Sequence, residues 1–154
     1  LFRSVSEVKW NYDEGTVFVY DDKPKEVKLE GVPEDIEVVY TDNCRINAGT
    51  YTARARLIYD TRNCEAAEIP DLKWRIRRAS YDTSGAHWTY EEPFTYDGTE
   101  KSITLKGVPE QIAVRYRDNK AIAAGRYTAK AYLTYDSDNY EAPEIETTID
   151  WEIK

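Results

Sequence analysis

Two cysteines and one histidine are the residues of this 154-residue chain best suited to covalent or acid–base chemistry. His87 is the only imidazole, so a Ser-His-Asp or Cys-His arrangement would have to use it as the base. It stands beside Trp88 in a small, polar stretch, and no nucleophile-elbow motif accompanies it. We therefore predict a solvated linker histidine, no catalytic residue and no enzyme.

Cys44 and Cys64 are the only thiols, and both lie in the first half of the chain. Lys120 and Tyr140 take their places in the second half, and this joint replacement indicates a disulfide if the compartment is oxidising. Strand geometry opposes the bridge. If residues 36–59 form an antiparallel hairpin, the two cysteines lie at its opposite ends, about 25–30 Å apart, whereas a disulfide needs Cα atoms within about 7 Å. The sequence leaves the disulfide open, and two cysteines with no nearby histidine cannot build a zinc site.

The stretch from Asp136 to Asn139 resembles the first positions of a calcium-binding loop. Such a loop needs a glycine at its sixth position and a glutamate at its twelfth, and these positions hold Glu141 and Thr147. We therefore predict a tight turn here, with no metal and no cofactor anywhere in the chain.

Four arginines form the possible ligand patch of the sequence: Arg54, Arg56, Arg75 and Arg77. They alternate with apolar residues in two predicted strands, so pairing of these strands would gather them on one outward face. This face could bind an acidic glycan or protein, or it could be a solvated face paired with neighbouring glutamates. Similarly, the four tryptophans could form a sugar-stacking platform, but their alternation with Ile and Tyr favours packing in the core or at a domain junction.

The overall charge excludes some partners. A net charge of −8 makes the chain a poor candidate for binding nucleic acid. No apolar run approaches the roughly 18 residues of a membrane span, so we predict no membrane insertion. There is no methionine and no signal-peptide pattern at Leu1, so we expect the chain to be a segment of a larger or processed protein.

Residues 49–59 and 125–135 are the elements around which the rest must be arranged. Each alternates strictly between inward and outward side chains, which is typical of a half-buried β-strand. An Ala-Gly-x-Tyr sequence opens each stretch and resembles a sandwich corner, where a tyrosine hydroxyl bonds back to upstream backbone. We predict Tyr51 and Tyr127 as these structural corners.

The two stretches belong to an internal repeat. With an offset of 76, residues 25–69 match residues 101–145 at about 26 of 45 positions, far above chance. We predict a first β repeat at 1–78, a linker at 79–87 and a second β repeat at 88–154. Short alternating segments separated by turns, without a helical stripe, predict an all-β fold of two tandem small domains, each an Ig-like or other β-sandwich.

The second repeat carries a series of motifs in a fixed order. They are Phe94-Thr95-Tyr96-Asp97-Gly98-Thr99, Gly107-Val108-Pro109, Tyr116 with Asp118-Asn119, Ala124-Gly125-x-Tyr127-Thr128-Ala129, Asn139-Tyr140 and Ile149-Asp150-Trp151-Glu152-Ile153. This series resembles the YDG/MBG-type β-rich repeats of bacterial surface proteins, over roughly residues 8–76 and 86–153. The first repeat departs from it with Tyr20-Asp21-Asp22 and Asn63-Cys64.

The resemblance implies an extracellular, surface-attached array module that acts as a spacer or adhesive unit without known catalysis. It also implies a relation to the β-grasp fold, which is the alternative to a sandwich. We therefore expect a structural spacer or adhesive stalk whose partners are neighbouring repeats of the same parent protein. The alternative function is a module that binds a glycan or a host surface protein through the arginine patch or exposed aromatic residues.

Overall fold

The computed structural model describes residues 8–58 and 69–154. All of its regular structure in these ranges is β-strand, so the fold is all-β. The helix that a β-grasp fold would lay across its sheet is absent from the described residues. None of these residues forms a helix that could span a bilayer. The chain divides into two compact units between Ala79 and Ser80, and each is described by itself.

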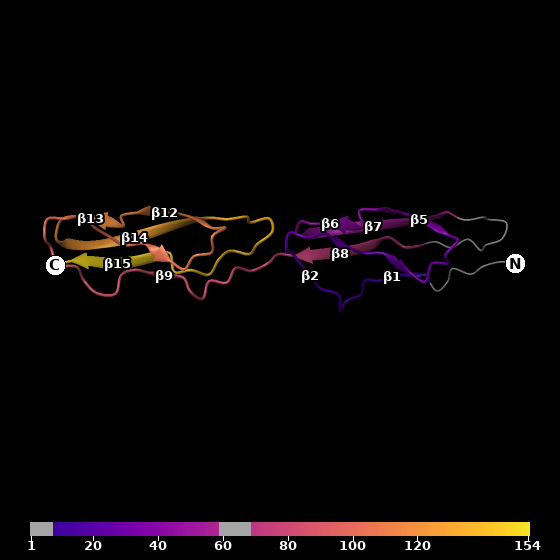
Figure 1. The fold of residues 1–154 in the computed structure, drawn as a ribbon, viewed down its shortest axis with the longest axis horizontal. Coiled ribbons are helices and arrows are strands. Elements are labelled where there is room, and N and C mark those ends of the chain that lie inside the picture. The colour runs from indigo at the N-terminus through magenta and orange to yellow at the C-terminus, as the bar shows by residue number, and fades with distance from the viewer. Residues whose placement is uncertain (1–7, 59–68) are drawn as a thin grey trace. The chain divides into compact units, whose positions relative to one another are not determined.

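Unit 1 is built around a four-stranded sheet with the order β2-β8-β7-β5 (Figure 1). Its strands are β2 (Phe18–Val19), β8 (Leu72–Arg77), β7 (Gly49–Ile58) and β5 (Glu37–Thr41). Two short antiparallel pairs accompany it, β1 (Lys9–Trp10) with β4 (Leu29–Glu30) and β3 (Lys25–Glu26) with β6 (Cys44–Arg45). Val27, between β3 and β4, packs with Ala53 and Trp74 of the main sheet, so the short pairs cover its inner face.

Unit 2 has a corresponding arrangement. Its main sheet has the order β12 (Ala113–Arg117), β14 (Gly125–Thr134) and β15 (Thr148–Ile153). The short pairs are β9 (His87–Trp88) with β11 (Leu105–Lys106) and β10 (Lys101–Ser102) with β13 (Lys120–Ala121). β5 and β12 are therefore edge strands of their main sheets.

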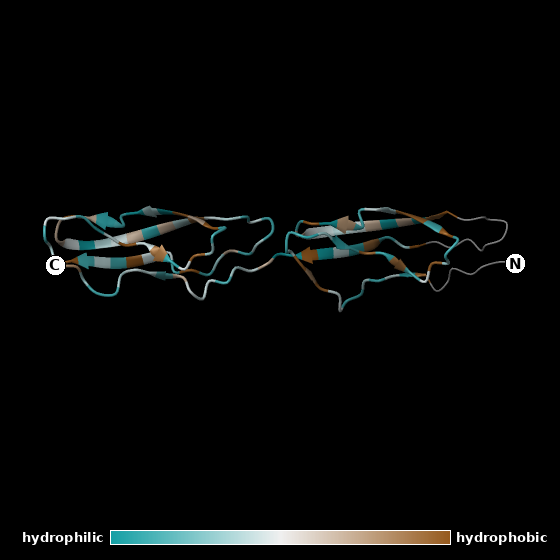
Figure 2. Ribbon diagram, in the orientation of Figure 1, coloured by the Kyte–Doolittle hydropathy of each residue, from teal (hydrophilic) through white to brown (hydrophobic). Residues whose placement is uncertain are grey.

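Alternation along the long strands produces one core in each unit, and Figure 2 shows it as bands of hydrophilic and hydrophobic residues. Ala53 and Ala129 are fully buried at the middle of β7 and β14, where their small size leaves room for Trp74 and Trp151. These two indoles are 1% and 2% exposed. They are core residues and do not form a sugar-stacking platform.

The buried indoles are held by the same type of hydrogen bond in both units. Trp74 Nε1 donates to the Asp42 carbonyl and Trp151 Nε1 to the Asp118 carbonyl, both at 3.0 Å. Asp42 and Asp118 have left-handed φ angles of 53° and 57°, which Asp tolerates better than most residues. The turn that follows β5 or β12 thus supplies a carbonyl acceptor for the buried indole N–H, which has no access to water.

The two predicted corner tyrosines also make equivalent bonds. Tyr51 donates its hydroxyl to the Asn47 carbonyl at 2.5 Å, and Tyr127 donates to the Ala123 carbonyl at 2.6 Å. Each bond spans four residues and ties the start of the long strand to the preceding loop. The tyrosine rings pack on the buried indole of their own unit, with centroids 5.3 and 5.0 Å apart.

Residues 79–87 were expected to form a linker, but most of this stretch packs against unit 2. Tyr81 stacks on Tyr140 with ring centroids 4.2 Å apart, and Thr83 donates to the Glu144 carbonyl at 3.0 Å. His87 and Trp88 form β9. Residues 80–87 are therefore part of unit 2. The sequence did not indicate this, because Tyr81 lies in a polar stretch and its partner Tyr140 is about 60 residues away.

The opening segment of each unit runs parallel to its last strand. In unit 1, β2 pairs with the end of β8. In unit 2, Phe94 forms a parallel bridge to Ile153. Trp10 Nε1 donates to the Pro70 carbonyl just before β8, and Trp88 Nε1 to the Glu146 carbonyl just before β15. The chain therefore enters each unit beside the beginning of the last strand and leaves it at that strand's far end.

Candidate functional site

The outer face of the unit 1 sheet carries the arginines predicted from the sequence. Arg54 and Arg56 are exposed on β7, and Arg75 and Arg77 are exposed on β8. The strands pair with Thr50 opposite Arg75, so all four side chains lie on one face. Arg54 pairs with Asp71 at 3.3 Å. The other three make no ion pair with a described residue.

Lys73 is a fifth cation of this face that our sequence analysis missed. It lies on β8 opposite Thr52 and is exposed, like Arg75 and Arg77. The alternation of Leu72–Arg77, with Trp74 and Ile76 buried, was the signal that could have found it. We call Lys73, Arg75 and Arg77 the β8 cation row.

A groove of about 390 Å³ lies beside this row and is called the β8 groove. The row forms one side, and Tyr12, Val17 and Phe18 contribute an apolar side. Val17 and Val19 are 54% and 45% exposed. The backbone amide of Arg75 donates to the Tyr12 hydroxyl at 3.2 Å, which fixes this tyrosine against β8.

Two carboxylates, Asp13 and Glu14, also line the β8 groove. Asp13 belongs to a tight turn, because its Oδ1 accepts from the Gly15 amide at 2.8 Å and from the Thr16 hydroxyl at 3.4 Å. The groove therefore offers cations along one strand, an apolar side, and hydrogen-bond acceptors at the turn.

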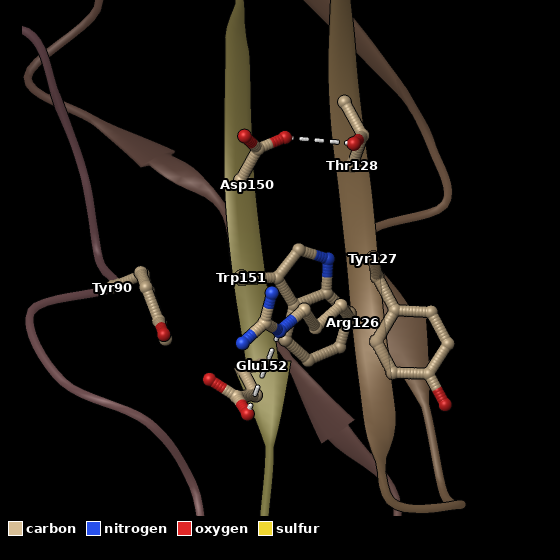
Figure 3. Close-up of a pocket in the computed structure, with 7 residues that line it drawn as sticks. All are labelled: Tyr90, Arg126, Tyr127, Thr128, Asp150, Trp151 and Glu152. Carbon is tan, nitrogen blue, oxygen red and sulfur yellow. Dashed lines mark hydrogen bonds and ion pairs between the residues drawn. The ribbon is translucent and has the colours of Figure 1, made fainter.

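Unit 2 has a groove of about 440 Å³ along β15, here called the β15 groove (Figure 3). Tyr90 faces the sheet across it, as Tyr12 does in unit 1, and each tyrosine follows the first tryptophan of its unit by two residues. On the sheet, Arg126 lies 3.9 Å from Glu152, and the Thr128 hydroxyl donates to Asp150 at 2.7 Å. The tyrosine–strand arrangement is thus common to both units.

The charge of the last strand is what differs between the grooves. Trp74 and Trp151 occupy equivalent core positions, so Lys73 corresponds to Asp150 and Arg75 to Glu152. In unit 2 the carboxylates are engaged by side chains of the neighbouring strand. In unit 1 the cations have only threonines opposite them, at Thr50 and Thr52.

Neither groove brings together a catalytic arrangement among the described residues. Glycoside hydrolases place their two carboxyl groups on either side of the scissile bond. Asp150 and Glu152 instead project from the same face of one strand, where Thr128 and Arg126 of β14 already engage them. The surface of the β15 groove can accept hydrogen bonds from a hydroxylated ligand and donate hydrogen bonds to a charged one.

The other residues selected from the sequence lie outside the grooves. Cys44 is exposed on β6, whereas Cys64 lies outside the described residues, so the disulfide stays open. His87 is exposed, with Nδ1 2.9 Å from the Gly85 carbonyl. Asp136 accepts from the Asp138 amide at 3.2 Å and the Asn139 side chain at 2.8 Å, as in a tight turn.

Acidic side chains of the described residues stabilise local turns and form no metal site. Residues 8–58 and 69–154 contain no cluster of three or more His, Cys, Asp or Glu side chains that could hold a metal. In the turn before β10, the hydroxyl of Thr99, together with Lys101 and the Thr99 amide, holds the pKa of Asp97 well below its usual range. Asp21 takes the equivalent place in unit 1, where Lys25 lowers its pKa. Both carboxylates stabilise turns.

No known family model matches the chain, and no curated protein or solved structure shows significant similarity to it.

Proposed function

We propose that the chain is a non-enzymatic repeat module that acts as a structural spacer or adhesive stalk of a bacterial surface protein outside the cell. The observation that carries this proposal is the path of the chain through each unit. The chain enters beside the beginning of the last strand and leaves at its far end, so each unit adds the length of that strand between neighbouring repeats.

The parallel arrangement also suits a module under tension. In unit 2, the Phe94 amide donates to the Glu152 carbonyl, the Lys154 amide to the Phe94 carbonyl, and the Tyr96 amide to the Lys154 carbonyl, at 3.0, 2.8 and 2.8 Å. In unit 1, the Tyr20 amide donates to the Arg77 carbonyl at 2.9 Å. Tension applied through the chain ends would pull these parallel segments past each other, so several hydrogen bonds must break together.

Single-molecule force spectroscopy on the 1–154 chain tests this proposal. Tyr96→Pro removes the amide that bonds to Lys154, while the Tyr96 ring, 54% exposed, contributes little to the core. We expect a clear decrease in the unfolding force of unit 2.

Tyr127→Phe is the matched control, because it removes one hydrogen bond of unit 2, worth about 0.5–1.5 kcal/mol, that is not among the bonds of the parallel pair. It should lower the unfolding force much less than Tyr96→Pro. Equal decreases would mean that the parallel pair does not resist the force, and the spacer proposal would lose its physical support.

A further inference from the structure

We infer that the β8 groove is a binding site for a linear acidic polysaccharide. The first observation is the β8 cation row itself. Lys73, Arg75 and Arg77 project from alternate positions of one strand, so neighbouring charges are spaced about 7 Å apart. They make no ion pair with any described residue, although the chain carries 29 acidic residues against 21 basic ones.

Some other cations in the described ranges are paired with carboxylates. Lys25 lies 2.8 Å from Asp21, and Lys101 lies 2.9 Å from Asp97. On β7, Arg54 pairs with Asp71. The β8 cation row differs in that three exposed cations without an ion pair to a described residue follow one another on one face of a strand and line a groove, and its complement is an anionic ligand.

The fold does not require cations at these positions. At the positions equivalent to Lys73 and Arg75, unit 2 carries Asp150 and Glu152 on the same type of strand, and only Arg77 has a cationic equivalent, Lys154. The row is thus a property of the unit 1 surface and not of the sheet. Both grooves have a tyrosine that faces the last strand, and they differ in the charge of that strand. Only the β8 groove is complementary to an anionic ligand.

The remaining sides of the groove favour a polysaccharide over an acidic protein or a nucleic acid. Val17 and Val19 are exposed beside the row and can contact the apolar C–H face of a sugar ring. The carboxylates of Asp13 and Glu14 can accept hydrogen bonds from sugar hydroxyls, whereas ionised acidic side chains and phosphodiesters have no hydrogen to donate to them. A chain of sugars with spaced sulfates or carboxylates satisfies all three sides.

The site is tested by exchanging the charges of the two grooves in the 1–154 chain. Lys73→Asp with Arg75→Glu imports the residues of unit 2, and Asp150→Lys with Glu152→Arg imports those of unit 1. Both pairs of substitutions use side chains that the corresponding sheet already carries, so folding should be preserved, which a thermal melt checks.

Binding is measured to heparin, polygalacturonate and neutral dextran, which separate sulfate, carboxylate and uncharged sugar. We expect the wild type to bind at least one of the two acidic polysaccharides, and more weakly as salt increases. The unit 1 exchange should weaken binding about 100-fold, or about tenfold for each lost charge-assisted contact. The unit 2 exchange should strengthen binding by supplying a second cation row.

Lys9→Asp with Lys23→Glu is the control for net charge, because it changes the charge of unit 1 equally at exposed positions outside the groove. This variant should bind nearly as the wild type does. The inference is overturned if the control loses as much affinity as the unit 1 exchange, if neither acidic polysaccharide binds, or if poly-glutamate or an oligonucleotide binds as tightly as the polysaccharides.

Discussion

Gly107 provides the sharpest test of how unit 2 is packed. It follows β11 and has a left-handed φ of 77°. A Cβ atom added there would lie 1.9 Å from the Gly85 carbonyl oxygen and 3.1 Å from the Ala86 amide nitrogen. Both neighbours are backbone atoms, so a rotamer change cannot relieve the contact. Gly107→Ala should therefore displace the segment that leads into β9.

The cost of this substitution has two parts. An alanine in the left-handed region costs about 1–2 kcal/mol, and overpacking against fixed atoms typically adds about 1–3 kcal/mol. We expect a total of about 2–5 kcal/mol. Gly98 separates the two parts, because its φ is 78° and a Cβ there would meet nothing within 4 Å. Gly98→Ala should cost only the first part.

Native-state hydrogen exchange measures both costs in the intact chain. The slowest amides of β14 report the free energy of unfolding of unit 2, and those of β7 provide an internal reference in unit 1. We expect Gly107→Ala to exceed Gly98→Ala by about 1–3 kcal/mol, with β7 unchanged. Equal costs would show that residues 85–86 do not pack tightly against Gly107, and the assignment of 80–87 to unit 2 would be wrong.

Three further results are expected. Tyr127→Phe should destabilise unit 2 by about 0.5–1.5 kcal/mol in urea denaturation; a neutral effect would mean that the corner bond contributes nothing. The pKa of Asp97 is lowered on folding, mainly by Thr99, so its contribution is complete above the unfolded pKa of about 3.9 and is lost as pH falls towards the folded value. Asp97→Asn should therefore lower the melting temperature more at pH 6 than at pH 2.5, and a constant difference would refute this. Tyr81→Ala removes a ring stacked on Tyr140 and should destabilise unit 2 by about 2–4 kcal/mol; a free linker would show no effect.

The long strands could be predicted from the sequence because their signal is local. Strict alternation and a central pair of alanines place β7 at Gly49–Ile58 and β14 at Gly125–Thr134, close to the expected limits. The same alternation favoured packing of the tryptophans in the core or at a domain junction, and Trp74 and Trp151 lie in the core. A half-buried strand must repeat its pattern every two residues, so a short window of sequence is sufficient.

Other features depend on partners that are distant in the chain. Tyr81 has polar neighbours in sequence, and only the fold brings it to Tyr140. The β8 groove requires the register of β8 and the position of Tyr12 together. The β8 groove and the β15 groove differ in charge, and this difference is visible only when Trp74 is aligned with Trp151. That alignment changes the offset between the two repeats from 76 to 77 residues after Ile69.

The charges on the edge strands β5 and β12 disfavour an exchange of these strands between the two similar units. Neighbouring domains of similar sequence can exchange strands while they fold. In the native pairing, Arg56 lies opposite Val39 and Arg54 opposite Thr41. If β12 replaced β5 in the same register, Arg115 and Arg117 would lie opposite these two arginines.

Like charges directly opposite each other on neighbouring strands are destabilising. The native units contain one such pair on these strands, Arg117 with Lys130. The exchanged arrangement would contain two, because β5 on β14 would place Thr41 opposite Lys130. The one additional pair disfavours the exchanged arrangement by an amount on the order of the 0.2–1 kcal/mol typical of a cross-strand pair, so the outer-face arginines help each half of the chain to select its own edge strand.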